Sequence, residues 1–112
     1  MAGENDGEVR DSPGRRRFEL SLGEQGTAFI DYREEPGAAG TAQGRRVLVL
    51  LHAEVPVALR GGGIGARLTR GTLELMRARE ERAVPRCPYV VDFIRRHPDF
   101  GDVVADLPGD RR

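Results

Sequence analysis

A glycine-rich turn in the middle of the chain has the residue types and the spacing of an anion-binding site. Four of the five residues from 61 to 65 are glycine, and a pattern typical of an amphipathic helix follows directly. Because glycine has no Cβ, the backbone N–H groups of such a turn stay uncovered, and they lie at the positive end of the helix dipole. The turn is therefore predicted to hold a phosphate group. An ordinary tight turn between a strand and a helix is the alternative.

Three known phosphate-binding sequence motifs can be compared with this turn. A Walker A loop needs a lysine that reaches the outer phosphates, and the chain has none, because all eighteen of its basic residues are arginine. A dinucleotide fingerprint fits Gly61, Gly63 and Ala66, but it needs an acidic residue at the end of the next strand, and residues 83–87 end in cysteine. The third pattern is R-x-x-G-x-G, carried by Arg60, Gly63 and Gly65.

The neighbouring residues extend the third pattern. HxEVPxxLRGxGIG begins at His52, and PxCPYVxxFIRRHPxF begins at Pro85. This order resembles the compact N-acetyltransferase-domain family, whose members are small proteins of the GNAT superfamily of N-acetyltransferases, and it covers roughly residues 18–104. The resemblance implies an enzyme that transfers an acetyl group from acetyl-coenzyme A to an amine. The acceptor amine cannot be identified from the sequence, because a fold does not specify a substrate.

The resemblance also indicates which residues bind the coenzyme. The backbone amides of 61–66 would hold the pyrophosphate, with Arg60 orienting the loop or neutralising charge, and Arg96 reaching a coenzyme phosphate. Pro56 removes a backbone donor and leaves nearby strand edge open to the pantetheine arm. The expected coenzyme-binding residues are Val55, Val57, Arg60, Gly61, Gly62, Gly63, Ile64, Gly65, Ala66 and Arg96.

Acetyl transfer to an amine also needs a base for the amine and a proton for the departing thiolate. Glu54 and His52 are the candidate bases, acting directly or through water, because both occupy one side of the strand that leads into the turn. The alternative is a surface pair without a catalytic role.

The acid is harder to place from sequence. Many GNAT enzymes carry a tyrosine in an F-Y-x-K-like run, and the corresponding position here is Ile94, within Phe93 to Arg96. Cys87 and Tyr89 are the nearest substitutes. Cys87 could donate a proton or accept the acetyl group as a nucleophile, or it could be a buried packing residue.

Length and composition restrict the remaining possibilities. The 112 residues support one domain, and a formal net charge of zero gives no field that would recruit nucleic acid or a membrane surface. One cysteine and two distant histidines make a poor metal site. Without a signal-peptide pattern or a long apolar run, a soluble cytoplasmic protein is expected. Monomer and homodimer both remain open.

The elements around the turn must position these residues. Alternating residues at 18–22 and 27–32 predict a hairpin, and the apolar run at 47–51 predicts a central strand that continues to residue 55. A helix at 64–82 and a strand at 83–87 would complete a parallel crossover, and a last helix is predicted at 89–97. The predicted fold is α/β, the minimal GNAT fold: a single splayed mixed sheet with an antiparallel N-terminal half, one strand–helix–strand crossover and a C-terminal helix.

The polar composition at the two ends predicts a disordered tail at 1–15, an N-acetyltransferase-like domain at 16–107 and a frayed end at 108–112. Residues 34–44 are predicted to form a mobile connection. A coenzyme A-binding or interaction module with little catalysis is the alternative to an enzyme, because the usual tyrosine is missing and the chain is short.

Overall fold

The computed structural model describes residues 8–35 and 46–105, in which five strands form one sheet in the order β1-β2-β3-β4-β5. The strands are β1 (Val9–Ser12), β2 (Arg17–Ser21), β3 (Thr27–Glu34), β4 (Val47–Glu54) and β5 (Arg82–Pro85). Neighbours from β1 to β4 are antiparallel, whereas β4 and β5 are parallel. The antiparallel N-terminal part and the single parallel pair confirm the predicted fold class.

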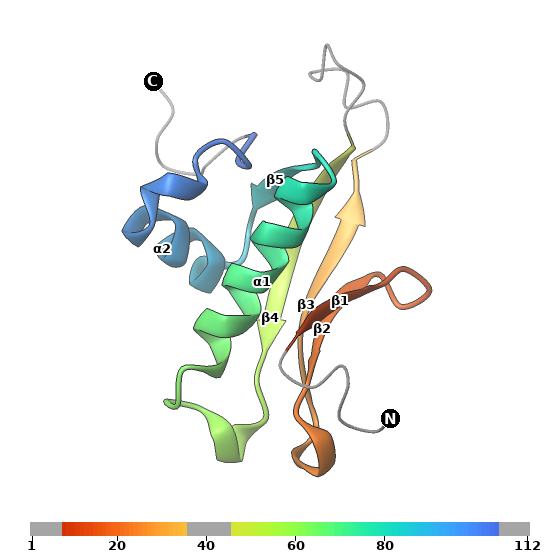
Figure 1. The fold of residues 1–112 in the computed structure, drawn as a ribbon, viewed down its shortest axis with the longest axis vertical. Coiled ribbons are helices and arrows are strands. Elements are labelled where there is room, and N and C mark those ends of the chain that lie inside the picture. Colours follow the sequence, from red (N-terminus) through yellow and green to blue (C-terminus); the bar gives the residue numbers. More distant parts are fainter. Residues whose placement is uncertain (1–7, 36–45, 106–112) are drawn as a thin grey trace.

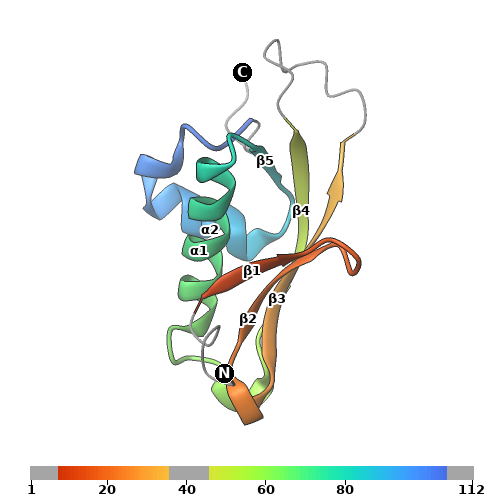
Figure 2. The same ribbon diagram turned by 45° about the vertical axis from the view of Figure 1, so that its right-hand side comes forward.

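Both helices lie on the same side of the sheet (Figures 1 and 2). Helix α1 (Ile64–Ala78) makes the crossover from β4 to β5, and α2 (Pro88–Arg96) follows β5. Three short 3-10 helices complete the described elements: η1 (Gly23–Gln25), η2 (Val57–Leu59) and η3 (Pro98–Phe100). The apolar stripe of α1 is buried against the sheet, where Leu68, Leu73 and Met76 are fully inaccessible. This packing of one helix face on one sheet face forms the core.

An extra residue in β4 sets which way the side chains near its end point. Tyr32 pairs with Leu50 but Asp31 pairs with His52, so Leu51 is a bulge with no direct partner on β3. A bulge shifts the two-residue alternation by one position. As a result Leu50 and Ala53 both contact the core, and His52 lies on the opposite face of the sheet.

The pairing of β4 with β5 ends at the same place. Leu50 is opposite Pro85, and the Leu50 carbonyl accepts hydrogen bonds from the backbone amides of Arg86 (2.8 Å) and Cys87 (3.2 Å). Beyond Leu50, within the described residues, β4 continues without β5 beside it. The sheet therefore splays, as predicted, and leaves one edge of β4 open.

The expectation of a disordered tail through residue 15 is wrong for residues 9–12, which form β1. Strand β1 pairs with β2 and packs on α1, because Val9 fits against Gly71, where a Cβ would lie 2.4 Å from Val9 Cγ2. The Asp11 carboxylate accepts a hydrogen bond from the Tyr32 hydroxyl at 2.7 Å and pairs with Arg79 at 2.9 Å. These partners are distant in sequence, so the polar composition of the segment did not predict them.

Smaller differences concern the ends of elements. Helix α1 ends at Ala78, before the predicted residue 82, and the chain then reverses through Glu80 at a φ of 61°. Strand β5 ends at Pro85, and after η3 the backbone of Val104 bridges to Ala83 beside β5. The predictions for residues 1–7, for most of the 34–44 connection and for 108–112 fall outside the described residues.

Candidate functional site

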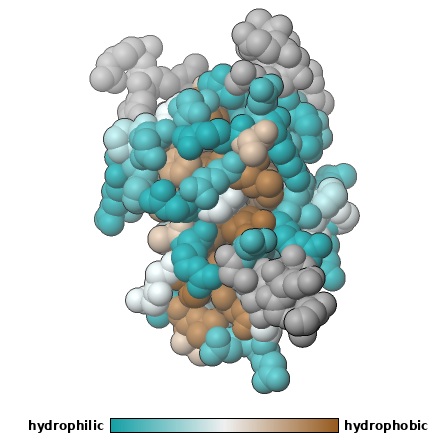
Figure 3. All heavy atoms as spheres, viewed as in Figure 1, coloured by the Kyte–Doolittle hydropathy of each residue, from teal (hydrophilic) through white to brown (hydrophobic). Residues whose placement is uncertain are grey.

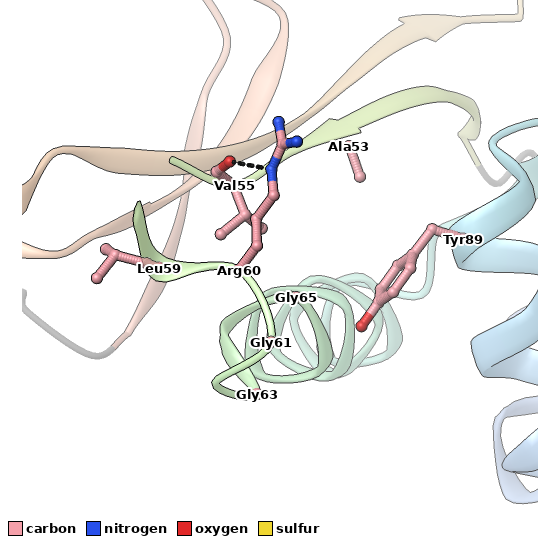
Figure 4. A pocket seen from close by; sticks show the side chains of 8 residues that line it. All are labelled: Ala53, Val55, Leu59, Arg60, Gly61, Gly63, Gly65 and Tyr89. Carbon is pink, nitrogen blue, oxygen red and sulfur yellow. Dashed lines mark hydrogen bonds between the residues drawn. The ribbon is translucent and has the colours of Figure 1, made fainter. Parts of the chain in front are cut away.

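A cleft of about 440 Å³ lies beside the open edge of β4. Three elements build it: the end of β4, the loop from η2 into α1, and the first turn of α2 (Figure 4). The residues that line it are Ala53, Val55, Leu59, Arg60, Gly61, Gly63, Gly65 and Tyr89. Six of these eight were predicted from the sequence, and Ala53 and Leu59 were not. Alternation with His52 and Glu54 could have indicated Ala53, because it places Ala53 beside Val55.

The loop reaches α1 through left-handed backbone that favours glycine. Gly61 has a φ of 89° and Gly63 a φ of 87°, and Gly63 is the residue that precedes the helix. No side chain caps the N-terminus of α1. The first N–H groups of this 15-residue helix therefore remain available beside the cleft, at the positive end of the helix dipole. An anion is the ligand that such a site favours.

Tyr89 extends from α2 to the first turn of α1 and closes one side of the cleft (Figure 4). A Cβ built on Gly65 would lie 2.7 Å from the Tyr89 hydroxyl oxygen, so a larger residue at position 65 would displace the Tyr89 ring from its place in the cleft. Tyr89 is nevertheless 46% exposed. Its hydroxyl can therefore meet a ligand in the cleft.

Arg60 links the loop to the end of β4. Its Nε donates a hydrogen bond to the Val55 carbonyl at 3.0 Å, and its Nη2 lies 3.6 Å from Glu54 Oε2 (Figure 4). The guanidinium thus holds the Val55 carbonyl in a hydrogen bond, and it also lies near the Glu54 carboxylate, on the other face of the strand. The side chain is 57% exposed, which leaves it free to reorient toward an anion.

The two candidate bases form a pair on the opposite face of β4 from Ala53 and Val55. His52 Nε2 and Glu54 Oε1 are 2.7 Å apart, and their side chains are 58% and 43% exposed. Neither residue is among those that line the cleft. The bulge at Leu51 explains this placement, because it turns His52 and Glu54 away from the helices.

Cys87 lies in the hydrophobic core and is 6% exposed. It precedes α2 as the N-terminal capping position, two residues after β5 ends. It is not among the residues that line the cleft. Packing is therefore a sufficient account of its burial.

Four other predicted coenzyme-binding residues are not among those that line the cleft. Ile64 and Ala66, in the first turn of α1, pack partly against the core. Arg96 is at the last turn of α2, where its Nε is 3.2 Å from Asp92 and its side chain is 72% exposed. Gly62 lies in the loop itself, with ordinary space around it.

An apolar area accompanies the cleft on the surface. Figure 3 shows apolar residues at the lower end of the molecule, over η2 and the end of β4. Val57 belongs to η2 and is 75% exposed. Next to the polar loop, this surface fits a ligand that has both an anionic and an apolar part.

Two features are absent from the described part of the chain. In the ranges 8–35 and 46–105, no group of three or more His, Cys, Asp and Glu side chains is placed to hold a metal ion. The described helices include none that is long and apolar enough to cross a membrane.

The sheet splays beyond Leu50, and a glycine loop leads into a helix at the opening. Residues 17–103 match the sequence model of the GCN5-related N-acetyl-transferase family. The match covers most of the chain, and the chain belongs to this family.

Curated relatives carry the name Protein NATD1. The protein from Bos taurus is 36% identical over 55 residues, which are 49% of this chain and 49% of that protein. The proteins from Gallus gallus and Homo sapiens are each 33% identical over 55 residues, or 49% of this chain and 50% and 49% of theirs. The chain thus spans about half the length of the curated relatives it matches.

Proposed function

We propose that this protein is an acetyl-coenzyme A-dependent N-acetyltransferase that acts on a primary amine. The observation that carries the proposal is the cleft, which joins an unpaired strand edge, an uncapped helix N-terminus and an exposed tyrosine hydroxyl. Family membership supports an acetyltransferase-like function.

Each part of the cleft has a role in this proposal. The backbone edge of β4 at Ala53 and Val55 would pair with the amide groups of the pantetheine arm, as an added strand would. The amides of the Gly61–Gly65 loop would bind the pyrophosphate. Arg60, which now contacts Val55 and Glu54, would exchange these contacts for a phosphate, since a guanidinium pairs well with phosphate oxygens.

Tyr89 is the group we propose as proton donor to the departing thiolate. Its hydroxyl lies in the cleft, at the N-terminal turn of α1, whereas the Cys87 side chain is buried in the core. Proton transfer by a positioned side chain contributes about 100-fold or more to a rate. A covalent role for Cys87 is the competing chemistry, and Cys87→Ala tests it.

A coenzyme A-binding module with little catalysis is the second candidate. Ile94 favours it, because this residue stands where many relatives in the superfamily carry the catalytic tyrosine, and it is 3% exposed in the core. Isoleucine has no ionisable group, so residue 94 cannot protonate the departing thiolate. The module would bind coenzyme A in the same cleft.

The test begins with mass spectrometry of the intact protein after incubation with acetyl-coenzyme A, under native and then denaturing conditions. Turnover is then measured with butylamine, spermidine and a lysine-containing peptide. The proposal expects retained coenzyme, turnover of at least one amine, and a loss of about 100-fold or more in Tyr89→Phe.

Each of the other outcomes has a distinct meaning. Retention without transfer to any amine would leave the binding module. An acetyl adduct that survives denaturation and disappears in Cys87→Ala would assign the chemistry to the thiol. Failure to retain the coenzyme would overturn both candidate functions.

A further inference from the structure

A second cavity, of about 450 Å³, lies at the other end of β4 from the cleft. The turn between β1 and β2, the end of β3 and the residue before β4 enclose it. The residues that line it are Pro13, Arg16, Tyr32, Arg33, Glu34 and Arg46. The cleft lies beside Ala53 and Val55, so the length of β4, roughly 20–25 Å, separates the two.

Three of the six residues that line the cavity are arginine, and two of them have unused hydrogen-bond donors. Arg16 is exposed, and its guanidinium has no ion-pair or hydrogen-bond partner within residues 8–35 and 46–105. Arg33 donates from Nη1 to Glu35 at 2.8 Å, and its other nitrogen atoms have no partner in the same two ranges. A guanidinium is permanently charged and donates five hydrogen bonds, so these groups favour an anion in the cavity.

The third arginine, Arg46, already holds a carboxylate in the cavity. Its Nε lies 3.2 Å and its Nη2 3.3 Å from the two carboxylate oxygens of Glu34. Such a two-pronged contact is the geometry in which arginine recognises carboxylates and phosphates. The Glu34 side chain is 53% exposed, so a stronger anion can displace it at little cost.

The opposite side of Arg46 is fixed inside the protein. Its Nη1 donates a hydrogen bond to Glu81 Oε2 at 2.7 Å, and Glu81 is only 4% exposed. Arg79, which pairs with Asp11, lies 3.4 Å from the same oxygen of Glu81. The guanidinium of Arg46 therefore stays in place when its contact with Glu34 is exchanged for a ligand.

The backbone of Arg16 indicates that its side chain is needed where it lies. Arg16 has a φ of 57°, in the left-handed region that favours glycine. Gly14 belongs to the same turn, but its φ is outside that region. Glycine thus stands at a position that does not require it, and arginine at one where glycine would relieve strain. What the position gains from arginine is a guanidinium that lines the cavity.

We propose that this cavity binds a small molecule through a phosphate monoester group, which Arg16, Arg33 and Arg46 hold in place of the Glu34 carboxylate. A phosphate monoester carries up to two negative charges and three strong acceptor oxygens, so it can engage all three guanidinium groups. A carboxylate has one charge and two oxygens. The site is independent of the proposed function, because the cavity and the cleft share no lining residue.

The test is an NMR titration of the protein with phenyl phosphate at constant ionic strength, followed at the backbone amides and the arginine Nε–H groups. The proposal predicts saturable shift changes at Arg16, Arg33 and Arg46. Arg15 is the internal reference, because it is 68% exposed, pairs with Glu19 and does not line the cavity. Benzoate, a single carboxylate on the same ring, should bind about tenfold more weakly or worse.

Arg16→Gly separates binding from folding. Glycine adopts a positive φ easily, so the variant should be at least as stable as the wild type in urea unfolding. It removes one guanidinium from the cavity and should weaken phenyl phosphate binding by about tenfold or more. Arg15→Gly removes the same charge from the same turn, and it should leave the affinity nearly unchanged.

Glu34→Gln tests the displacement in the opposite direction. The amide is a weaker partner for Arg46 than the carboxylate, so phenyl phosphate should bind several-fold more tightly than in the wild type. Glu19→Gln is its control, because it removes the same charge outside the cavity. Equal gains in the two variants would mean that Glu34 does not occupy the binding position.

The remaining outcomes are distinct. Shift changes spread evenly over exposed arginines such as Arg10 and Arg15, or an affinity that Arg16→Gly leaves unchanged, would overturn the site. Benzoate binding as tight as that of phenyl phosphate would overturn the assignment to phosphate. Saturating coenzyme A should leave the affinity for phenyl phosphate unchanged, and its loss would mean that the probe binds in the cleft. Failure to bind coenzyme A at all would overturn the proposed function and leave this site standing.

Discussion

Gly63 holds a left-handed backbone conformation at the start of α1, with a φ of 87°. A Cβ at this position would meet nothing within 4 Å, so the requirement for glycine here is conformational and not a matter of space. Gly62 is its matched control, because its φ is outside the left-handed region and a Cβ would lie at an ordinary 3.6 Å from the Leu59 carbonyl.

We therefore predict that Gly63→Ala lowers the free energy of unfolding by about 1–2 kcal/mol. Gly62→Ala should be neutral or stabilising by about 0.4–1 kcal/mol, because it restricts the unfolded chain at a compatible position. Urea unfolding of both variants checks this. Equal destabilisation by the two substitutions would contradict the conformation assigned to Gly63.

Tyr32 gives a second prediction for a single residue. Burial, and then its hydrogen bond to the Asp11 carboxylate, raise the pKa of Tyr32 from 10.0 to about 12. A raised folded-state pKa contributes stability that is present below pH 10 and is lost as the pH rises toward 12. Unfolding measured across this window should show a loss of about 2–3 kcal/mol in the wild type.

Tyr32→Phe is the control for this titration, because it retains the ring and removes the ionising group. Cys87 and Tyr89 are still present in the variant, so the difference between the two curves isolates Tyr32. Parallel curves for wild type and Tyr32→Phe above pH 10 would show that Tyr32 does not stabilise the fold in this way.

The contact between β1 and α1 depends on one glycine within the helix. Alanine at position 71 would gain roughly 1 kcal/mol in helix propensity, but its Cβ would lie 2.4 Å from Val9 Cγ2. Valine is stiff at χ1, so the overlap must move β1. The overlap is therefore expected to outweigh the gain in propensity.

We predict that Gly71→Ala destabilises the protein by about 1–3 kcal/mol, the usual cost of overpacking. In the Val9→Ala background the same substitution should cost much less, since the clashing methyl groups are absent. Thermal unfolding of the four proteins in this cycle checks the prediction. An additive cycle would mean that β1 does not pack on Gly71.

An element is predicted well from the sequence when its stabilising contacts follow a local pattern, and poorly when they come from residues distant in the sequence. The alternation of Phe18 and Leu20 and the apolar stripe of α1 are local patterns, and they predicted β2 to within one residue and the start of α1 at Ile64. Strand β1 has a single apolar residue and is held by Gly71 and Arg79, which no local pattern indicates.

The same reasoning explains the candidate site. The glycine loop was predicted because four glycines before a helical pattern leave backbone N–H groups uncovered, and Val55 followed from its place before the loop. The bulge at Leu51 was not predicted, because a continuous apolar run does not reveal which face each side chain takes. His52 and Glu54 could be placed on one face of the strand from the sequence. Because the bulge was unknown, the sequence did not show that this face is the one away from the cleft.

The molecule separates its candidate site from the polar contacts that hold β1. The cleft lies at the N-terminal end of α1, whereas Arg79, which pairs with Asp11 and Glu81, follows its C-terminal end. In Figure 1, the length of α1 separates the loop that lines the cleft from the turn that follows Ala78. Changes at Tyr32 or Gly71 that leave the protein folded should therefore leave coenzyme A affinity unchanged.

The central claim is that the cleft beside β4 binds coenzyme A, and backbone-amide NMR during a titration with coenzyme A tests it most directly. The account predicts that the largest changes in amide chemical shift fall on Val55, Gly61, Gly63 and Gly65, with smaller changes at Tyr89. Residues of β1, the strand at the edge of the sheet farthest from β5, serve as the internal reference. Shift changes that avoid the loop, or none at saturating coenzyme A, would contradict the account.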